Sequence, residues 1–110
     1  MNLLTQLTLG EMLEFLSTFD DNTLLIPSWS NAIPSEEDAN RVSLFRVNRG
    51  TVRTLRNVLI RALTTPLQGH RYTHDTLVDV RNGSSEGSMT LGVLIASVRP
   101  WKALGETQNP

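Results

Sequence analysis

The sequence predicts an α+β fold, in which two amphipathic helices lie on one face of a small, mainly antiparallel four-stranded sheet. Apolar residues recur at helical spacing after Thr8 and after Thr51. Four short runs rich in apolar and β-branched side chains read as strands: residues 23–26, 42–47, 76–81 and 89–99. The predicted order is therefore α-β-β-α-β-β. We expect one compact domain over residues 1–102 and a flexible C-terminal tail over residues 103–110.

The first helix is predicted over residues 9–19. Thr8 and Glu11 match the capping box, in which each side chain accepts a hydrogen bond from the other residue's backbone N–H. Asn22 suits the left-handed conformation that ends many helices. The run TLLI at residues 23–26 then predicts a short buried strand, which Pro27 interrupts because proline has no N–H to donate.

The middle of the chain predicts a loop, a strand and a helix. Residues 27–40 contain two prolines, three serines and three acids without a regular period, which favours a long loop. The run VSLFRV at residues 42–47 predicts a strand. Thr51 is the expected N-cap of the second helix, which ends before Pro66.

Alternation in the run TLVDVR predicts a strand over residues 76–81, with the valines facing the core and Asp79 and Arg81 facing out. Residues 82–88 (NGSSEGS) follow as a Gly/Ser turn, and residues 89–99 (MTLGVLIASVR) as the most hydrophobic strand. Within it, Gly92 indicates a bulge or a close backbone approach. We expect Trp101 to pack back on the body of the protein.

Charge is sorted along the chain. Residues 1–38 carry seven acids and no Lys or Arg, whereas residues 39–74 carry seven arginines and no acid. Such blocks predict either an anionic partner or an acidic surface that folds back onto a basic one. Because the blocks are complementary, they also predict a symmetric homo-oligomer.

Composition excludes several classes of function. The chain has no cysteine, which rules out disulfides, thiolate metal sites and cysteine nucleophiles. It has no apolar run of membrane-spanning length and no signal-peptide pattern, so we expect a cytoplasmic protein without a membrane partner. A pI of about 6.1, and arginines without interleaved aromatic residues, argue against nucleic acid as the partner.

The strongest candidate site lies within residues 68–88, where both histidines, the single tyrosine and three glycines gather. Polar groups of different hydrogen-bonding character are typical of a small-ligand pocket, and glycine-rich turns let backbone N–H groups approach an anion. With Trp29 as a further stacking residue, the predicted ligand-binding residues are Arg71, Tyr72, His74, Arg81, Asn82, Gly83, Ser84, Ser85 and Trp29. The simpler alternative is a polar loop followed by a hairpin turn, with Trp29 packed over the sheet edge as the more ordinary use of a tryptophan.

A second anion site is predicted at the start of the second helix. Helix N-termini favour anions, and four arginines lie at or near this one: Arg46, Arg49, Arg53 and Arg56. Arg61 lies further round the helix. The alternative interpretation pairs this surface with the acids of the preceding loop, Glu36, Glu37 and Asp38.

Metal binding and catalysis are the weaker hypotheses for this region. His70 and His74 are four residues apart, but in the extended structure expected here that spacing separates them by about 13 Å. Asp75 could orient His74 as a general base, yet no nucleophile motif accompanies the pair. We therefore predict no metal, no cofactor and no catalytic residue.

Several short motifs resemble small uncharacterised proteins of tailed-phage genomes. The opening LTLGEML at residues 7–13 and FDDNT at residues 19–23 are similar, as are the later Thr-capped helix, the G-x-x-Y-T segment at residues 69–73, the strand beginning at Thr76 and the GSSEG turn at residues 83–87. The resemblance implies a phage or prophage accessory protein expressed in a bacterial cytoplasm. It transfers no catalytic residue.

Together these features predict a non-catalytic protein that binds a small anionic, nucleotide-like ligand, and that acts in a phage setting as a sponge for a host defence signal. The alternative is an inhibitor or adaptor that contacts a host protein through its acidic loop or its arginine face. A third possibility is an enzyme that acts on a nucleotide.

Overall fold

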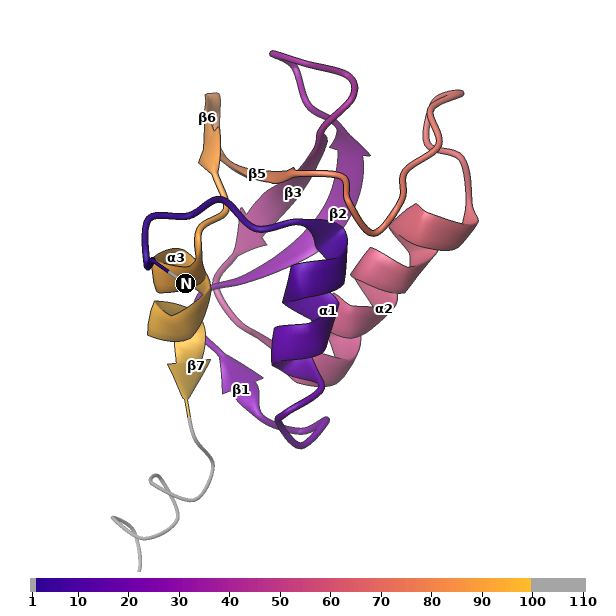
Figure 1. Ribbon diagram of the computed structural model, residues 1–110. Helices are drawn as coiled ribbons and strands as arrows, with labels where there is room; N and C mark the ends of the chain where they lie inside the picture. The colour runs from indigo at the N-terminus through magenta and orange to yellow at the C-terminus, as the bar shows by residue number, and fades with distance from the viewer. Residues whose placement is uncertain (1, 100–110) are drawn as a thin grey trace, which may run out of the picture.

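The computed structural model describes residues 2–99 of the chain (Figure 1). In chain order its elements are α1 (Leu9–Leu16), β1 (Leu24–Leu25), β2 (Ser28–Pro34), β3 (Val42–Val47), β4 (Gly50–Thr51), α2 (Val52–Thr64), β5 (Val78–Asn82), β6 (Ser85–Ser88), α3 (Leu91–Ser97) and β7 (Val98–Arg99). The expectations for Trp101 and for a tail over residues 103–110 lie outside the described residues.

The fold is α+β, as predicted, but its strands form two sheets instead of one. A four-stranded sheet has the order β2-β3-β5-β6, and a small three-stranded sheet has the order β4-β1-β7. The larger sheet is mixed, because β3 and β5 run parallel while its other pairs are antiparallel. A parallel pair needs a crossover connection, and α2 supplies it between β3 and β5.

Both predicted helices form where their caps place them. The Thr8 side chain accepts from the Glu11 N–H at 3.1 Å, and Glu11 accepts from the Thr8 N–H at 2.9 Å. Thr51 caps α2 in the same way, with Thr54 as its reciprocal partner. The first helix ends at Leu16 rather than at residue 19, because Ser17 already occupies its C-cap.

The predicted loop over residues 27–40 is wrong for its first half, which forms β2. This strand pairs antiparallel with β3, and its register shifts between Trp29 and Ala32. A β-bulge of this kind breaks the alternation of inward and outward side chains, so the sequence shows no period there. Within the predicted turn over residues 82–88, Ser85–Ser88 likewise forms a strand, β6, which pairs with β5.

The predicted strand over residues 89–99 is also wrong, because most of it forms the helix α3. Thr90 caps this helix by accepting from the Val93 N–H at 3.2 Å. The N-terminal segment satisfies two further N–H groups: Leu91 donates to the Thr5 carbonyl at 3.3 Å, and Gly92 to the Leu3 carbonyl at 2.9 Å. A Cβ at Gly92 would lie 3.1 Å from the Leu3 oxygen, so the expected close backbone approach is present.

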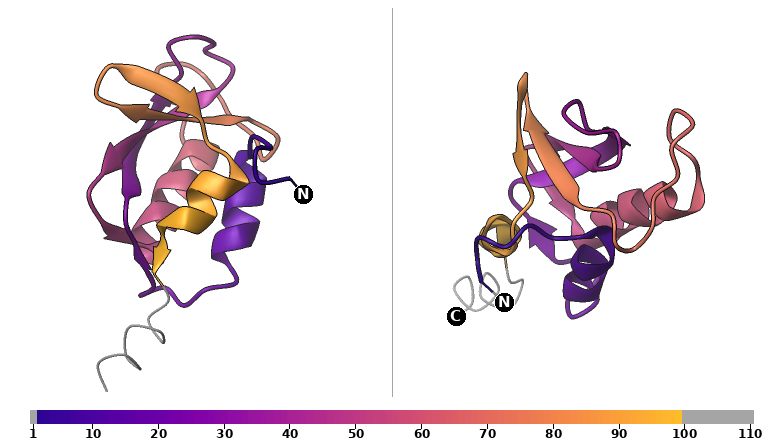
Figure 2. Two further views of the ribbon diagram at one scale, coloured as in Figure 1. Left: turned by 90° about the vertical axis from the view of Figure 1, so that its left-hand side faces the viewer. Right: turned by 45° about the horizontal axis from the view of Figure 1, so that its top comes forward.

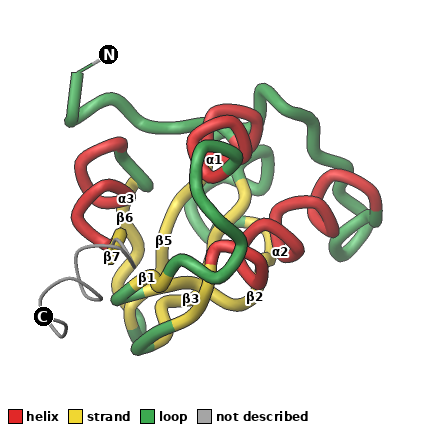
Figure 3. Tube along the Cα trace, turned by 90° about the horizontal axis from the view of Figure 1, so that it is seen from below, coloured by secondary structure: helices red, strands yellow, loops and turns green. Residues whose placement is uncertain are grey.

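The core lies between the helices and the four-stranded sheet (Figure 2). It includes fully buried side chains from α1, α2, β3 and β5: Leu9, Met12, Leu16, Val52, Leu55, Leu59, Val42, Leu44 and Val78. Figure 3 shows the three helices on the same side of this sheet. Among the described residues, no helix is both long and apolar enough to cross a membrane.

Candidate functional site

The sheet face opposite the helices carries Asp79, and residues 35–41 fold over it. Asp79 accepts hydrogen bonds from three side chains: Gln6 Nε2 at 2.8 Å, Ser35 Oγ at 2.8 Å and Arg41 Nε at 2.9 Å. Its side chain is only 4 % exposed. The alternation rule therefore assigns Asp79 to the correct face, but this face is covered by the chain itself instead of open to solvent.

The Arg81 side chain lies on the same covered face and contacts acidic and aromatic side chains there. Its guanidinium pairs with the Glu36 carboxylate and lies 3.6 Å from Glu86 Oε2. It also lies over the Phe45 ring, 5.4 Å from the ring centroid. With only 14 % of its side chain exposed, Arg81 has little surface for the phosphate contact that the sequence predicts.

Glu86 joins this cluster to residues 35–37. The Ser35 hydroxyl lies 2.8 Å from both Glu86 Oε1 and Asp79 Oδ2. Because a hydroxyl carries one proton, it donates to one of these carboxylates at a time. The N–H groups of Glu36 and Glu37 also point to Glu86, at 3.4 Å each. Residues 35–37 are therefore held against the sheet face that carries Asp79 and Arg81.

The pKa of Glu86 predicts how acid affects this cluster. Burial alone would raise this pKa, but the nearby Ser43 hydroxyl, the hydrogen bonds from Ser35 and the Glu37 N–H, and the Arg81 charge hold it below its ordinary value of 4.5. The unfolded chain therefore binds more protons near that pH, and the stability that Glu86 contributes is lost as the pH falls through its folded-state pKa.

We expect Glu86→Gln to weaken the dependence of unfolding free energy on pH between about pH 5 and pH 3. Urea denaturation at a series of pH values measures this slope in both proteins. Asp21, whose pKa is also lowered, is present in both, so the difference between the slopes isolates Glu86. Equal slopes would show that Glu86 does not carry this effect.

At the start of α2, two of the four predicted anion-binding arginines already have a partner. Asp21 pairs with Arg56 and lies 3.6 Å from Arg53 Nε. The hydrogen bond from Arg56 is the main reason that the pKa of Asp21 is lowered. Arg46 and Arg49 are exposed, and neither pairs with an acid among residues 2–99. The alternative of internal pairing is therefore observed, although with Asp21 in place of Glu36, Glu37 and Asp38.

Acidic and basic side chains of the same chain thus pair with each other. Glu37 and Asp38 lie 3.6 and 3.8 Å from the Arg41 guanidinium, which is bound more closely by Asp79. Asp79 is also the main reason that the pKa of Arg41 is raised. Self-association stays a prediction, but these internal pairs take up much of the charge that motivated it.

The structure separates the other residues of the predicted ligand site. Trp29 is 3 % exposed and belongs to the core. Residues 82–85 form the exposed tip of the β5–β6 hairpin, where Gly83 has a positive φ of 65°. Tyr72 is 6 % exposed and donates to the Ala39 carbonyl at 3.0 Å. Its burial raises the pKa of the phenol.

The two histidines lie in different surroundings. The His70 ring stacks beside Tyr72, with 6.5 Å between centroids and 14° between planes. His74 lies at the start of α1, where its carbonyl accepts from the Gly10 N–H at 2.9 Å. Among residues 2–99, no three His, Asp or Glu side chains gather closely enough to hold a metal ion.

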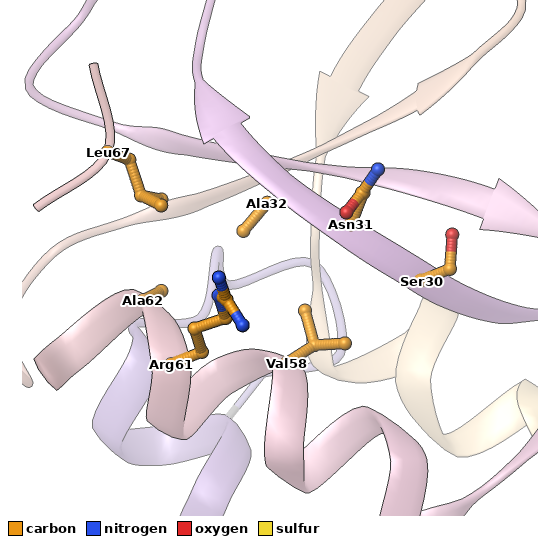
Figure 4. A pocket seen from close by; sticks show the side chains of 7 residues that line it. All are labelled: Ser30, Asn31, Ala32, Val58, Arg61, Ala62 and Leu67. Atoms are coloured by element: carbon orange, nitrogen blue, oxygen red, sulfur yellow. The ribbon is translucent and has the colours of Figure 1, made fainter. Parts of the chain in front are cut away.

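Two separate hollows share the lining residue Ala62, near the C-terminal end of α2. The first, of about 70 Å³, lies between α2 and the bulge of β2 and is lined by Ser30, Asn31, Ala32, Val58, Arg61, Ala62 and Leu67. Figure 4 shows the Arg61 side chain reaching from α2 toward this strand. The second, of about 190 Å³, is lined by Ala62, Leu63, Thr64, Thr65, Pro66, Arg71, Tyr72 and Thr73.

A tight turn brings Arg71 back to this end of α2. Leu67 and His70 exchange backbone hydrogen bonds of 2.9 Å, with Gln68 and Gly69 between them at φ values of 51° and 84°. Positive φ at both central residues is the conformation of a type I′ turn, which glycine adopts without strain. The chain then continues past the helix end and places Arg71 and Tyr72 beside it.

The structure places Arg71 and Tyr72 at the larger hollow, and it places Arg61, which belongs to neither predicted site, at the smaller one. From the sequence, Arg61 is known only to lie away from Arg53 and Arg56 on the helix. The opposite wall contains Asn31, whose place depends on the β-bulge and gives no signal in the sequence.

Within residues 2–99, ion pairs to acids are formed by Arg41, Arg53, Arg56 and Arg81. Arg61 and Arg71 form none, and both are exposed. The described part of the chain therefore has two guanidinium groups without an acidic partner, at two hollows that share a lining residue.

Comparison of the chain with protein-family models, with curated proteins and with solved structures gives no match in any of the three.

Proposed function

We propose that this protein is a non-catalytic binding protein whose ligand is a small anion held near the end of α2. One observation carries the proposal: Arg61 and Arg71, which have no acidic partner among residues 2–99, line two hollows that share the lining residue Ala62. Guanidinium groups bind phosphate or carboxylate in bidentate fashion, and here no internal acid competes for them.

The lining fits an anion attached to a compact apolar group. Thr65 and Thr73 line the larger hollow, and their hydroxyls are neutral hydrogen-bonding groups. Val58 and Leu67 line the smaller one and would contact the uncharged part of the ligand. Such a mixture of apolar walls and few polar groups is typical of small-molecule sites.

The volumes limit the ligand. At about 70 and 190 Å³, each hollow is smaller than the roughly 300–1,000 Å³ of most ligand pockets. A nucleotide-like ligand would therefore place its phosphate at one of these arginines and leave its base outside. Neither Tyr72 nor Trp29 offers a free ring face for stacking, because both side chains are buried.

The biological role follows from the resemblance to phage proteins. A protein that binds without turnover would lower the free concentration of its ligand, as a sponge for a nucleotide-like signal of host defence does. An enzyme acting on the same ligand differs in one readout: chromatography after incubation would reveal a product.

We expect Arg61→Ala and Arg71→Ala each to weaken binding about 10- to 100-fold, since each removes a charge-assisted hydrogen bond. Thermal shift with a panel of nucleotides and inorganic phosphate identifies the ligand, because a ligand that binds only the folded state raises the melting temperature. Calorimetry then compares the variants.

Arg49→Ala is the matched control, because Arg49 is an exposed arginine that lines neither hollow. It should bind as the wild type does. The proposal fails if no compound of the panel raises the melting temperature, or if all three variants bind equally well.

A further inference from the structure

A second hollow surface lies between α1 and α3, away from the arginines. It has a volume of about 250 Å³ and is lined by Leu7, Glu11, Glu14, Phe15, Thr18 and Leu91. Glu11, Glu14 and Phe15 are spaced i, i+3 and i+4 on one side of α1, and Thr18 follows the C-cap residue Ser17. The left view of Figure 2 shows α1 and α3 next to each other. We call the hollow the α1–α3 groove.

Exposed apolar side chains lie on α3 and on the N-terminal segment that binds it. Six large apolar residues are exposed in the described chain, and four of them belong to α3 or to the N-terminal segment that binds it: Leu3 at 56 %, Leu4 at 82 %, Val93 at 39 % and Ile95 at 44 %. Ile95 lies four residues after Leu91 and extends the same side of α3. Clustered exposed apolar side chains mark interaction surfaces in soluble proteins.

The charge on the groove is negative. α3 has no charged residue, whereas α1 contributes Glu11 and Glu14 to the rim. One Glu11 oxygen already accepts the Thr8 N–H, while exposed Glu14 forms no ion pair with a base among residues 2–99. The acidic segment over residues 36–38, in contrast, is paired with Arg41 and Arg81.

We propose that the α1–α3 groove binds an amphipathic helix of another protein, with apolar side chains on one face and Lys or Arg at its flanks. Glu11, Glu14, Phe15 and Leu91 belong to α1 and α3, and Leu7 and Thr18 to the segments that flank α1, so none of the lining residues belongs to a strand that could pair with an extended peptide. A helix satisfies its own backbone and presents anchors at i, i+3, i+4 and i+7. The eight residues of α1 span about 12 Å, which matches two turns of such a helix.

The test uses a designed 18-residue peptide with leucines at i, i+3, i+4 and i+7 and lysines elsewhere, against the full chain. We expect chemical shift changes at Phe15, Leu91 and Ile95, and an affinity that falls about tenfold or more in Ile95→Ser. Ile60→Ser is the matched control, because Ile60 on α2 is 42 % exposed and Ile95 is 44 % exposed. It should bind as the wild type does.

Reversing the charge of Glu14 tests whether the negative rim of the groove attracts the basic flanks of the helix. Glu14→Lys should weaken binding of the lysine peptide and strengthen binding of the same peptide with glutamates in place of lysines. The proposal is overturned if Ile60→Ser and Ile95→Ser lose the same amount of peptide affinity. It is also overturned if Glu14→Lys does not reverse the preference between the lysine and glutamate peptides. Concentration-dependent dimerisation through these residues overturns it too, because it would assign the groove to a second copy. The groove would be assigned to residues 100–110 if Trp101→Ala shifted the resonances of Phe15, Leu91 and Ile95 in the free protein and the peptide did not bind.

Discussion

Replacing Asp79 by Ala is expected to lower the free energy of unfolding by about 3 kcal/mol, because a buried charge partner is removed from an ionic cluster. The carboxylate accepts from Gln6, Ser35 and Arg41, and its side chain is 4 % exposed. Without it, Gln6 retains only the Val78 carbonyl and Ser35 only Glu86, while Arg41 retains only its longer pairs with Glu37 and Asp38. Arg41 is 27 % exposed, so water compensates part of the loss at its guanidinium.

Urea denaturation of the wild type and three variants measures this effect. Asp75→Ala is the matched control, because Asp75 is exposed, and it should change the free energy by less than about 0.5 kcal/mol. Asp79→Asn retains one acceptor oxygen and should fall between the two. If Asp79→Ala unfolds at the same urea concentration as Asp75→Ala, the cluster does not hold the fold together.

The first two helices were predictable because their signals are local. Thr8 and Glu11 are three residues apart, and the bonds between them form within one helical turn. Thr51 begins α2 for the same reason. The strand β3 was predictable from its β-branched and aromatic composition.

The elements that the sequence missed depend on distant contacts. The run after Met89 is short and apolar, and such a run suits a strand or a buried helix equally well. Its helical form is supported by carbonyls of Leu3 and Thr5, almost ninety residues earlier in the chain. The strand β2 was hidden because its bulge removes the alternation that identifies a strand.

The candidate site was predictable in part. The block pattern indicates that acid and base meet or that an anion binds, but it cannot show which arginine meets which acid. Arg81 pairs with Glu36 only because residues 35–41 fold over the sheet, and the same segment leaves the Arg81 side chain little exposed. Arg71, a predicted ligand-binding residue, is exposed and lines a hollow, whereas Arg61 lines a hollow only because α2 packs against β2.

Trp29→Ala is expected to lower the free energy of unfolding by about 3–5 kcal/mol, the range for removing a large aromatic side chain from a core. Trp29 is 3 % exposed and packs with the core residues, next to the bulge of β2. From the sequence alone, Trp29 could either stack on a ligand or, as the more ordinary use, pack over the sheet edge. If the stacking role held, the substitution would weaken ligand binding and leave stability nearly unchanged.

Urea denaturation followed by far-UV circular dichroism separates the two roles without relying on tryptophan fluorescence. Leu4→Ala is the control, because Leu4 is 82 % exposed, and its loss should change stability by less than about 0.5 kcal/mol. Trp29→Phe keeps an aromatic ring in the same space and should lose less than Trp29→Ala. A Trp29→Ala protein as stable as Leu4→Ala would mean that the indole does not fill the core, and would return Trp29 to the candidate ligand site.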